Sequence, residues 1–155
     1  AKELVYLPAV AQLEWLWHRA FNSRDNASLS ENIQPLSALE NVPEERFANI
    51  RFRAVSSVSL LTSDYPVHRI WLVNQEDYEG DQTVRLEEGS VKLLLWRSAD
   101  YGMRVDELSD DEYAFINALL EDKTFGYISE MQFSQGLEEI LQRCIETGLI
   151  LGFRV

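Results

Sequence analysis

The residues that could bind a metal ion are few in this chain. It contains two histidines, His18 and His68, and one cysteine, Cys144. A metal site needs several histidine, cysteine or carboxylate ligands at suitable spacing. The clearest neighbour of this kind is Glu14, four residues before His18. We therefore predict no metal site, and we expect both histidines to be structural or solvated.

The sequence also lacks the motifs of nucleophilic and cofactor chemistry. Cys144 falls on the apolar stripe of a predicted helix, where a thiol acts as a small hydrophobic side chain rather than a nucleophile. The seven glycines form no phosphate-binding loop, nucleophile elbow or dinucleotide fingerprint. We predict a protein without a cofactor that is not an enzyme. An enzyme built from scattered carboxylates is the weaker alternative.

Length and composition indicate a packed interior. The chain has 155 residues, of which 46% are hydrophobic, with four Trp, six Tyr and seven Phe; this predicts one domain, or two small units that share a core. No apolar run approaches the roughly 20 residues of a membrane span, and the first residues do not form a signal segment. One cysteine cannot form an internal disulfide, which fits a cytoplasmic location. The chain lacks an initiator Met, so we expect a fragment whose upstream part is absent.

The charge disfavours nucleic acid as a partner. The formal net charge is −12, from 14 basic and 26 acidic residues, and the acidic excess is spread over the whole chain. Binding to phosphate backbones is driven by clustered Lys and Arg, because these release counterions. An acidic chain without a basic stripe therefore predicts a partner other than DNA.

The order of the elements that must position any site indicates an α+β fold. Residues 1–78 read as a half of helices and short strands, and residues 79–155 as a winged-helix-like half, with the acidic loop 76–82 between them. We expect the two halves to form one compact unit, in which N-terminal helices and short strands pack on a winged-helix-like peptide-recognition module. The predicted strands are 50–53, 58–61, 91–97, 101–105 and 149–153, and the predicted helices are 8–22, 67–75 and three that begin near 109, 124 and 134.

Two of these elements carry specific expectations about burial. The run Val91–Trp96 is apolar except for Lys92, which predicts a strand that is buried on both faces. Ser109 and Glu112 have the spacing of a capping box, so a helix should begin there. Its predicted buried face is Tyr113, Ile116 and Leu120, and that of the 8–22 helix is Val10, Leu13, Leu16, Trp17, Ala20 and Phe21.

A winged-helix module binds either DNA or an added peptide strand. A DNA-reading helix needs basic or amide side chains, but the last predicted helix carries Glu138, Glu139 and Glu146 against Arg143 alone. A peptide needs an open strand edge beside a helix, and the strand 101–105 is the predicted edge. The residues expected to contact a peptide are Tyr101, Met103, Arg104, Val105 and Ile140. The alternative is that Arg104 and Asp106 protect this edge from pairing.

Trp15 lies on the opposite side of the 8–22 helix from its apolar stripe. The simpler interpretation is that Trp15 packs under the loop that follows the helix. The sharper one is that it forms a docking surface for a partner or an upstream domain, since exposed aromatic side chains mark many interfaces.

Several segments together resemble the C-terminal domain of HvfC/BufC-type proteins, and the resemblance covers essentially the whole chain. Its clearest parts are the start Leu-Pro-x-x-Ala-x-Leu-Glu-Trp and the segment Tyr-Pro-Val-x-x-Ile-Trp. The segments that carry it are 6–15, 64–71, 91–97, the 112–120 helix and the ending Gly148-Leu149-Ile150.

The resemblance implies a function. Proteins of this family act as partners of multinuclear non-haem iron enzymes that oxidatively modify cysteines in ribosomally made peptides (RiPP biosynthesis), often in metal homeostasis. The partner binds the precursor peptide and carries no iron itself. The family is also catalogued as DNA-binding because of an N-terminal helical domain, which is missing here. The resemblance therefore implies a non-catalytic domain that binds a precursor peptide and docks to an iron enzyme, with a DNA-binding transcription regulator as the alternative.

Overall fold

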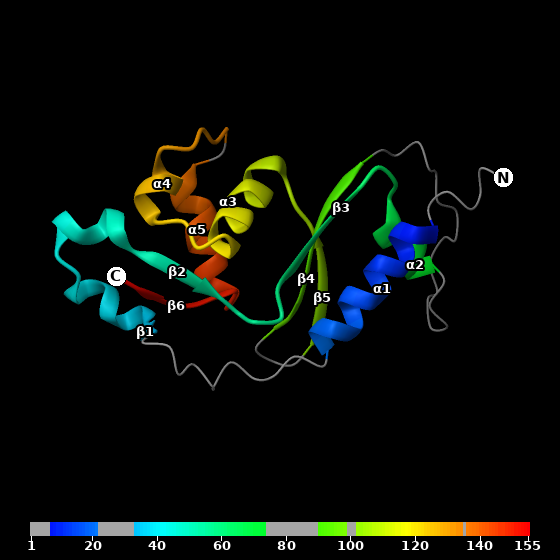
Figure 1. Ribbon diagram of the computed structural model, residues 1–155, viewed down its shortest axis with the longest axis horizontal. Coiled ribbons are helices and arrows are strands. Elements are labelled where there is room, and N and C mark those ends of the chain that lie inside the picture. The colour runs from blue at the N-terminus through cyan, green and yellow to red at the C-terminus, as the bar shows by residue number, and fades with distance from the viewer. Residues whose placement is uncertain (1–6, 22–32, 74–89, 99–101, 135) are drawn as a thin grey trace.

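The computed structural model describes residues 7–21, 33–73, 90–98, 102–134 and 136–155. It contains two three-stranded antiparallel sheets, with helices packed against each (Figure 1). The predicted α+β class is confirmed. No helix among the described residues has both the length and the apolar character needed to cross a membrane.

The central strand of one sheet is the strand that was predicted to be buried on both faces. The strands of this sheet are β3 (Ser59–Ser63), β4 (Val91–Arg97) and β5 (Met103–Glu107), in the order β3-β4-β5. Leu94 and Trp96 of β4 face one hydrophobic cluster, and Leu93 and Leu95 face the other. All four side chains are buried, so the prediction of burial on both faces is confirmed.

One face of this sheet is covered by α1 (Leu7–Phe21) and α2 (Val67–Val73), at the right of Figure 1. Leu13 and Leu16 of α1 are buried against Leu93 and Leu95. Phe21, which the helical stripe placed in the core, is instead 56% exposed. It is the last residue of α1, and its backbone carbonyl accepts a hydrogen bond from Arg97 Nη1 of β4 at 3.1 Å, so only its side chain points away from the sheet.

The second sheet consists of β1 (Gln34–Pro35), β6 (Ile150–Arg154) and β2 (Arg51–Ala54), in the order β1-β6-β2. Two 3-10 helices, η3 (Leu36–Asn41) and η4 (Glu44–Asn49), lie between β1 and β2 in the chain. The helices α3 (Asp110–Leu120), α4 (Phe125–Ser129) and α5 (Leu137–Glu146) lie above this sheet in Figure 1. Their apolar side chains form one cluster with those of β2 and β6 and with Leu94 and Trp96 of β4.

The helix starts follow from local capping. Ser109 accepts a hydrogen bond from the Glu112 backbone N–H, and the Glu112 carboxylate accepts one from the Ser109 backbone N–H, which is the predicted capping box. Thr124 caps α4 in the same way through the Tyr127 N–H. The buried residues of α3 are Phe115, Ile116, Ala118 and Leu119. Leu120 is 45% exposed, so the predicted face was wrong by about one residue at that end, because the helix packs between the two sheets rather than on one.

The chain halves are interleaved. β6 pairs with β1 and β2, while β4 and β5 pair with β3. Among the described strands, each sheet therefore combines residues from both sides of the expected 78/79 boundary. The last strand of the expected winged-helix module lies in a different sheet from its first two. The boundary itself falls outside the described residues.

A charged cluster fastens the end of α3 to the second sheet. Arg51 and Arg154 are directly opposite each other on β2 and β6. The Arg154 guanidinium donates to the Asp122 carboxylate, and that of Arg51 donates to the Asp122 carbonyl. Asp122 has a φ of 62°, a left-handed conformation that Asp tolerates better than most residues. The carboxylate thus offsets the repulsion between two opposed arginines.

Gly152 is required by the close approach of β1. A Cβ at this position would overlap the Gln34 carbonyl oxygen and lie 2.9 Å from Ile33 Cγ2. We expect Gly152→Ala to lower the free energy of unfolding by about 1–3 kcal/mol, because the two strands must separate to admit the methyl group. Urea unfolding followed by circular dichroism measures this loss.

Gly136→Ala is the matched control. At Gly136 the nearest atom to an added Cβ is Glu139 Cγ at 3.8 Å. We expect a loss below about 1 kcal/mol, from the weaker capping by alanine alone. Equal losses in the two variants would contradict the close approach of β1 and β6 at Gly152.

Candidate functional site

Strand β5 forms one edge of its sheet, and its hydrogen bonds show which backbone groups face outward. Leu108 N–H donates to the Lys92 carbonyl at 2.8 Å, and Ser98 N–H donates to the Gly102 carbonyl at 2.9 Å. These pairs and the uninterrupted register place Trp96–Arg104 and Leu94–Asp106 at hydrogen-bonded positions between them. The N–H and C=O groups of Met103, Val105 and Glu107 therefore point away from β4. No described strand pairs with them.

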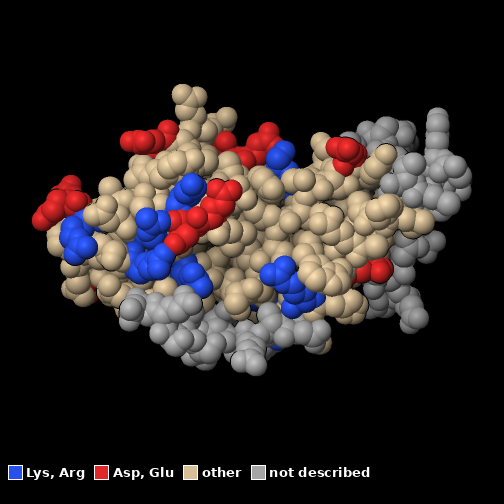
Figure 2. All heavy atoms as spheres, in the orientation of Figure 1, with Lys and Arg blue, Asp and Glu red and all other residues tan. Residues whose placement is uncertain are grey.

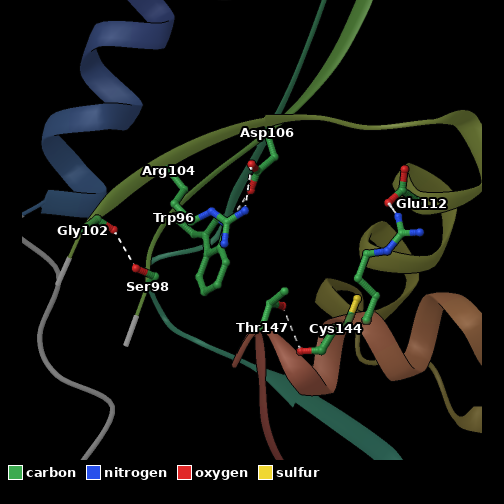
Figure 3. Close-up of polar contacts among 9 residues, drawn as sticks. Trp96, Ser98, Gly102, Arg104, Asp106, Glu112, Cys144 and Thr147 are labelled. Atoms are coloured by element: carbon green, nitrogen blue, oxygen red, sulfur yellow. Dashed lines mark hydrogen bonds and ion pairs between the residues drawn. The ribbon is translucent and has the colours of Figure 1, made fainter. Parts of the chain in front are cut away.

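A cavity lies beside this edge, between the sheet and helices α3 and α5. Its volume is about 240 Å³. Its apolar lining is formed by Leu94, Trp96, Leu108, Ile116, Cys144 and Leu149. Its polar lining is formed by Arg104, Asp106, Glu107, Glu112, Arg143 and Thr147. Figure 3 shows Trp96, Arg104 and Asp106 coming from the sheet, opposite Cys144 of α5 and Thr147, the residue that follows this helix.

Three side chains on the sheet side form one connected group. Asp106 accepts a hydrogen bond from the Trp96 indole Nε1 at 3.1 Å and pairs with Arg104 Nη2 at 3.3 Å. The Arg104 guanidinium also lies over the Trp96 ring, 5.4 Å from its centre, which is within cation–π range. Trp96 is only 1% exposed, so its single polar atom is satisfied inside the protein.

A second ion pair lies on the helical side of the cavity. Arg143 Nη1 of α5 is 2.7 Å from Glu112 Oε2 of α3, so the same glutamate caps α3 and ties it to α5. At one end of β5, Glu107 Oε2 lies 3.8 Å from His68 Nε2. The cavity is therefore an apolar floor with charged side chains around its mouth.

The structure distributes the predicted contact residues over different environments. Arg104 lines the cavity. Val105 lies on the opposite face of the sheet and packs against the hydrophobic cluster that contains Leu13 and Leu16 of α1. Met103 alternates with Arg104 and so lies on the Val105 face. Tyr101 lies outside the described residues. Ile140 does not line the cavity: it is 1% exposed and belongs to the core, one helical turn before Cys144, which does line the cavity.

The sequence did not single out Trp96, Cys144, Thr147 or Glu112 as site residues. One signal was present for Cys144 and Thr147. Their helical spacing, together with that of Arg143, places the three residues on adjacent parts of one surface. Nothing local indicates that this surface meets β5, because the two elements are brought together only by the packing of α3 and β6. The cavity was therefore not predictable from spacing.

Trp15 is 62% exposed, and the Arg19 guanidinium lies over its ring, 5.7 Å from the centre. Both interpretations of Trp15 stay predictions, because one of them depends on the loop that follows the helix. The loop in question, residues 22–32, lies outside the described part of the chain.

The charges of the helical region do not form a basic surface. Figure 2 shows acidic and basic side chains interspersed over β2 and β6. Glu138, Glu139 and Glu146 of α5 are all exposed, on the helix that would have to approach DNA. Within the described ranges, no group of three or more His, Cys, Asp or Glu side chains is arranged to hold a metal ion.

The environment of Cys144 gives a pH-dependent prediction. Burial raises the pKa of the thiol from its ordinary value of 9.0 to about 12; the Glu112 carboxylate adds to this rise, and Arg143 opposes it. The unfolded chain therefore loses this proton near pH 9, while the folded protein keeps it until about pH 12. The stabilising contribution is present below pH 9 and is lost as the pH rises through this range.

We expect the free energy of unfolding to fall between pH 8 and 10.5 more steeply in the wild type than in Cys144→Ala. Urea titrations at a series of pH values measure both slopes. The alanine variant also serves as the control, because it keeps every other titrating group. Parallel slopes would contradict a buried, protonated thiol.

Comparison with known proteins gives no further guide: no protein-family model and no curated protein matches this chain.

Proposed function

We propose that this chain is a non-catalytic peptide-binding domain that holds an extended peptide on the edge of β5. The observation that carries this proposal is the outward direction of the Met103, Val105 and Glu107 backbone groups at an edge beside a cavity. An extended peptide uses such an edge as one more strand, with main-chain hydrogen bonds for affinity and side-chain pockets for specificity.

The position of the cavity distinguishes β5 from the other edge of the sheet. Arg104, Asp106 and Glu107 of β5 line it, whereas no residue of β3 does. A strand added to β5 would therefore extend the sheet beside this cavity. The Arg104–Asp106 pair is on the cavity face and does not cover the outward backbone groups, so it protects this edge only weakly.

The resemblance to HvfC/BufC-type proteins supplies the biological partners in this proposal. The peptide is the leader of a ribosomally made precursor, and the second partner is a multinuclear non-haem iron enzyme that modifies it. The domain supplies binding and orientation, and the enzyme supplies the iron and the oxidation. Exposed Trp15 is the proposed docking contact for the enzyme or for an upstream helical domain.

Titration with a cognate leader peptide, followed by amide chemical shifts, tests the peptide-binding proposal. We expect shifts at residues 103–107 and at the cavity side of α5. Shifts confined to other surfaces would refute the β5 site. Tighter binding to duplex DNA than to the leader, with affinity that falls steeply with salt, would favour a DNA-binding regulator instead.

Co-expression with the iron enzyme encoded beside this gene tests the partner proposal. We expect the two proteins to co-purify, and Trp15→Ala to weaken the association about tenfold or more, as for other central aromatic contacts. Phe47→Ala removes another exposed aromatic side chain (41% exposed) far along the chain and is the control. A wild-type protein that never associates with the enzyme would overturn this part of the proposal.

A further inference from the structure

The cavity beside β5 has the size of a side-chain receptor. Its volume of about 240 Å³ is below the roughly 300–1,000 Å³ of pockets for cofactors and drug-sized molecules. The space therefore suits one large side chain better than a small-molecule ligand.

The geometry of β5 determines which side chains of an added strand reach this space. Residues opposite Arg104 and Asp106 would have their side chains on the same face as these two residues, which is the cavity face. Residues opposite Met103, Val105 and Glu107 would face the α1 side. Every second residue of the peptide is thus directed toward the cavity.

The floor of the cavity offers apolar contact. Leu94, Ile116 and Leu149 are each no more than 4% exposed, and the Trp96 indole N–H already donates to Asp106. Burying a large apolar side chain there removes its surface from water without leaving a polar group unpaired. A charged or amide side chain would lose its hydration without such compensation.

The surroundings of the mouth favour positive charge in the rest of the peptide. Arg104 and Arg143 are already paired, with Asp106 and Glu112 respectively. Glu107 adds a further carboxylate at the edge, and its side chain is 57% exposed. Glu139 and Glu146 are exposed on α5, and the net charge of the chain is −12. The approach to the groove is therefore negative and attracts a basic peptide.

We propose that this cavity receives one large apolar side chain, aromatic or branched aliphatic, from a basic peptide paired with β5. The inference rests on the proposed peptide-binding function and specifies its ligand: an extended segment in which an apolar anchor is accompanied by Lys or Arg. The anchor lies opposite Arg104 or Asp106, so it also fixes the register of the peptide.

The test is a selection from a displayed library of random twelve-residue peptides, using the full chain as bait. We expect at least tenfold enrichment of peptides that carry a large apolar residue at a fixed spacing from Lys or Arg. The same selection is repeated with Thr147→Phe, which fills the cavity mouth from an exposed position. Gln142→Phe, at an exposed position of α5 that does not line the cavity, is the matched control.

The apolar preference should disappear with Thr147→Phe and persist with Gln142→Phe. Three results would overturn this inference and leave the β5 site intact, provided that the selected peptides shift the amides of residues 103–107. The peptides could show no apolar preference, they could keep that preference with Thr147→Phe, or they could be acidic. Failure to enrich any peptide, or enrichment of peptides that do not shift those amides, would overturn both.

Discussion

Replacing Val105 with proline is expected to weaken the binding of an extended peptide about tenfold or more while the protein remains folded. The Val105 N–H points away from β4, so proline removes no hydrogen bond of the sheet, and its ring occupies the edge where a peptide would pair. Proline is tolerated on edge strands in this orientation. We expect a loss of stability of roughly 1–2 kcal/mol, from the change of φ and the altered contact with α1.

Arg104→Pro is the matched control, because the two residues are neighbours with opposite backbone directions. The Arg104 N–H faces Trp96 of β4, so proline there removes a ladder bond and leaves a carbonyl unsatisfied, at a cost of about 1–3 kcal/mol beyond the change of φ. Fluorescence anisotropy with a labelled leader or selected peptide measures binding, and urea unfolding measures stability. Unchanged peptide affinity in Val105→Pro would exclude β5 as the docking edge.

Phe153→Ala is expected to lower the free energy of unfolding by about 3–5 kcal/mol, the range for removal of a fully buried aromatic side chain. Phe153 is 0% exposed and stands opposite Phe52 on the central strand of its sheet. Phe52 in turn contacts the Phe125 ring edge-to-face at 5.9 Å. The cavity left by the substitution thus lies where β6, β2 and α4 meet. The expected loss is a large part of the free energy of unfolding of a typical domain, ~5–15 kcal/mol.

Val155→Ala tests whether this effect comes from burial. Val155 is two residues further along and 39% exposed, so we expect a change within about 0.5 kcal/mol. Thermal unfolding at matched protein concentration compares the two variants. A loss below 1 kcal/mol in Phe153→Ala would mean that β6 is not the central strand of a packed sheet.

The local elements of this protein could be predicted because their signals are local. The apolar run 91–96 predicted a strand buried on both faces, and Ser109 with Glu112 predicted the start of α3; both are confirmed. Alternation of Ile50 and Phe52 with arginines predicted β2. In each case the deciding interaction lies within one strand or one helical turn, so neighbouring residues carry enough information.

The candidate site could be predicted only in part. An open edge strand at residues 101–105 was expected from the sequence, and β5 (Met103–Glu107) lies at the edge of its sheet. Ile140 is buried in the core and does not line the cavity, although Cys144 on the same helical stripe does; helical periodicity locates the stripe but not where along it a cavity opens. Phe21 and Leu120, which periodicity placed on buried faces, are exposed, and each is the last residue of its helix.

By itself, the sequence determined the α+β class, the order of the α-helices and of strands β2 to β6, and the acidic character of the last helix. The tertiary structure alone decided that β6 pairs with β2 and β1 while β5 remains an edge, and that Trp96, Asp106 and Cys144 line one cavity. Strand pairing joins residues as far apart as Arg51 and Arg154, and backbone hydrogen bonds are the same for every side chain. Which strands pair is therefore decided by the arrangement that buries all the apolar faces at once. A local sequence pattern does not contain this information.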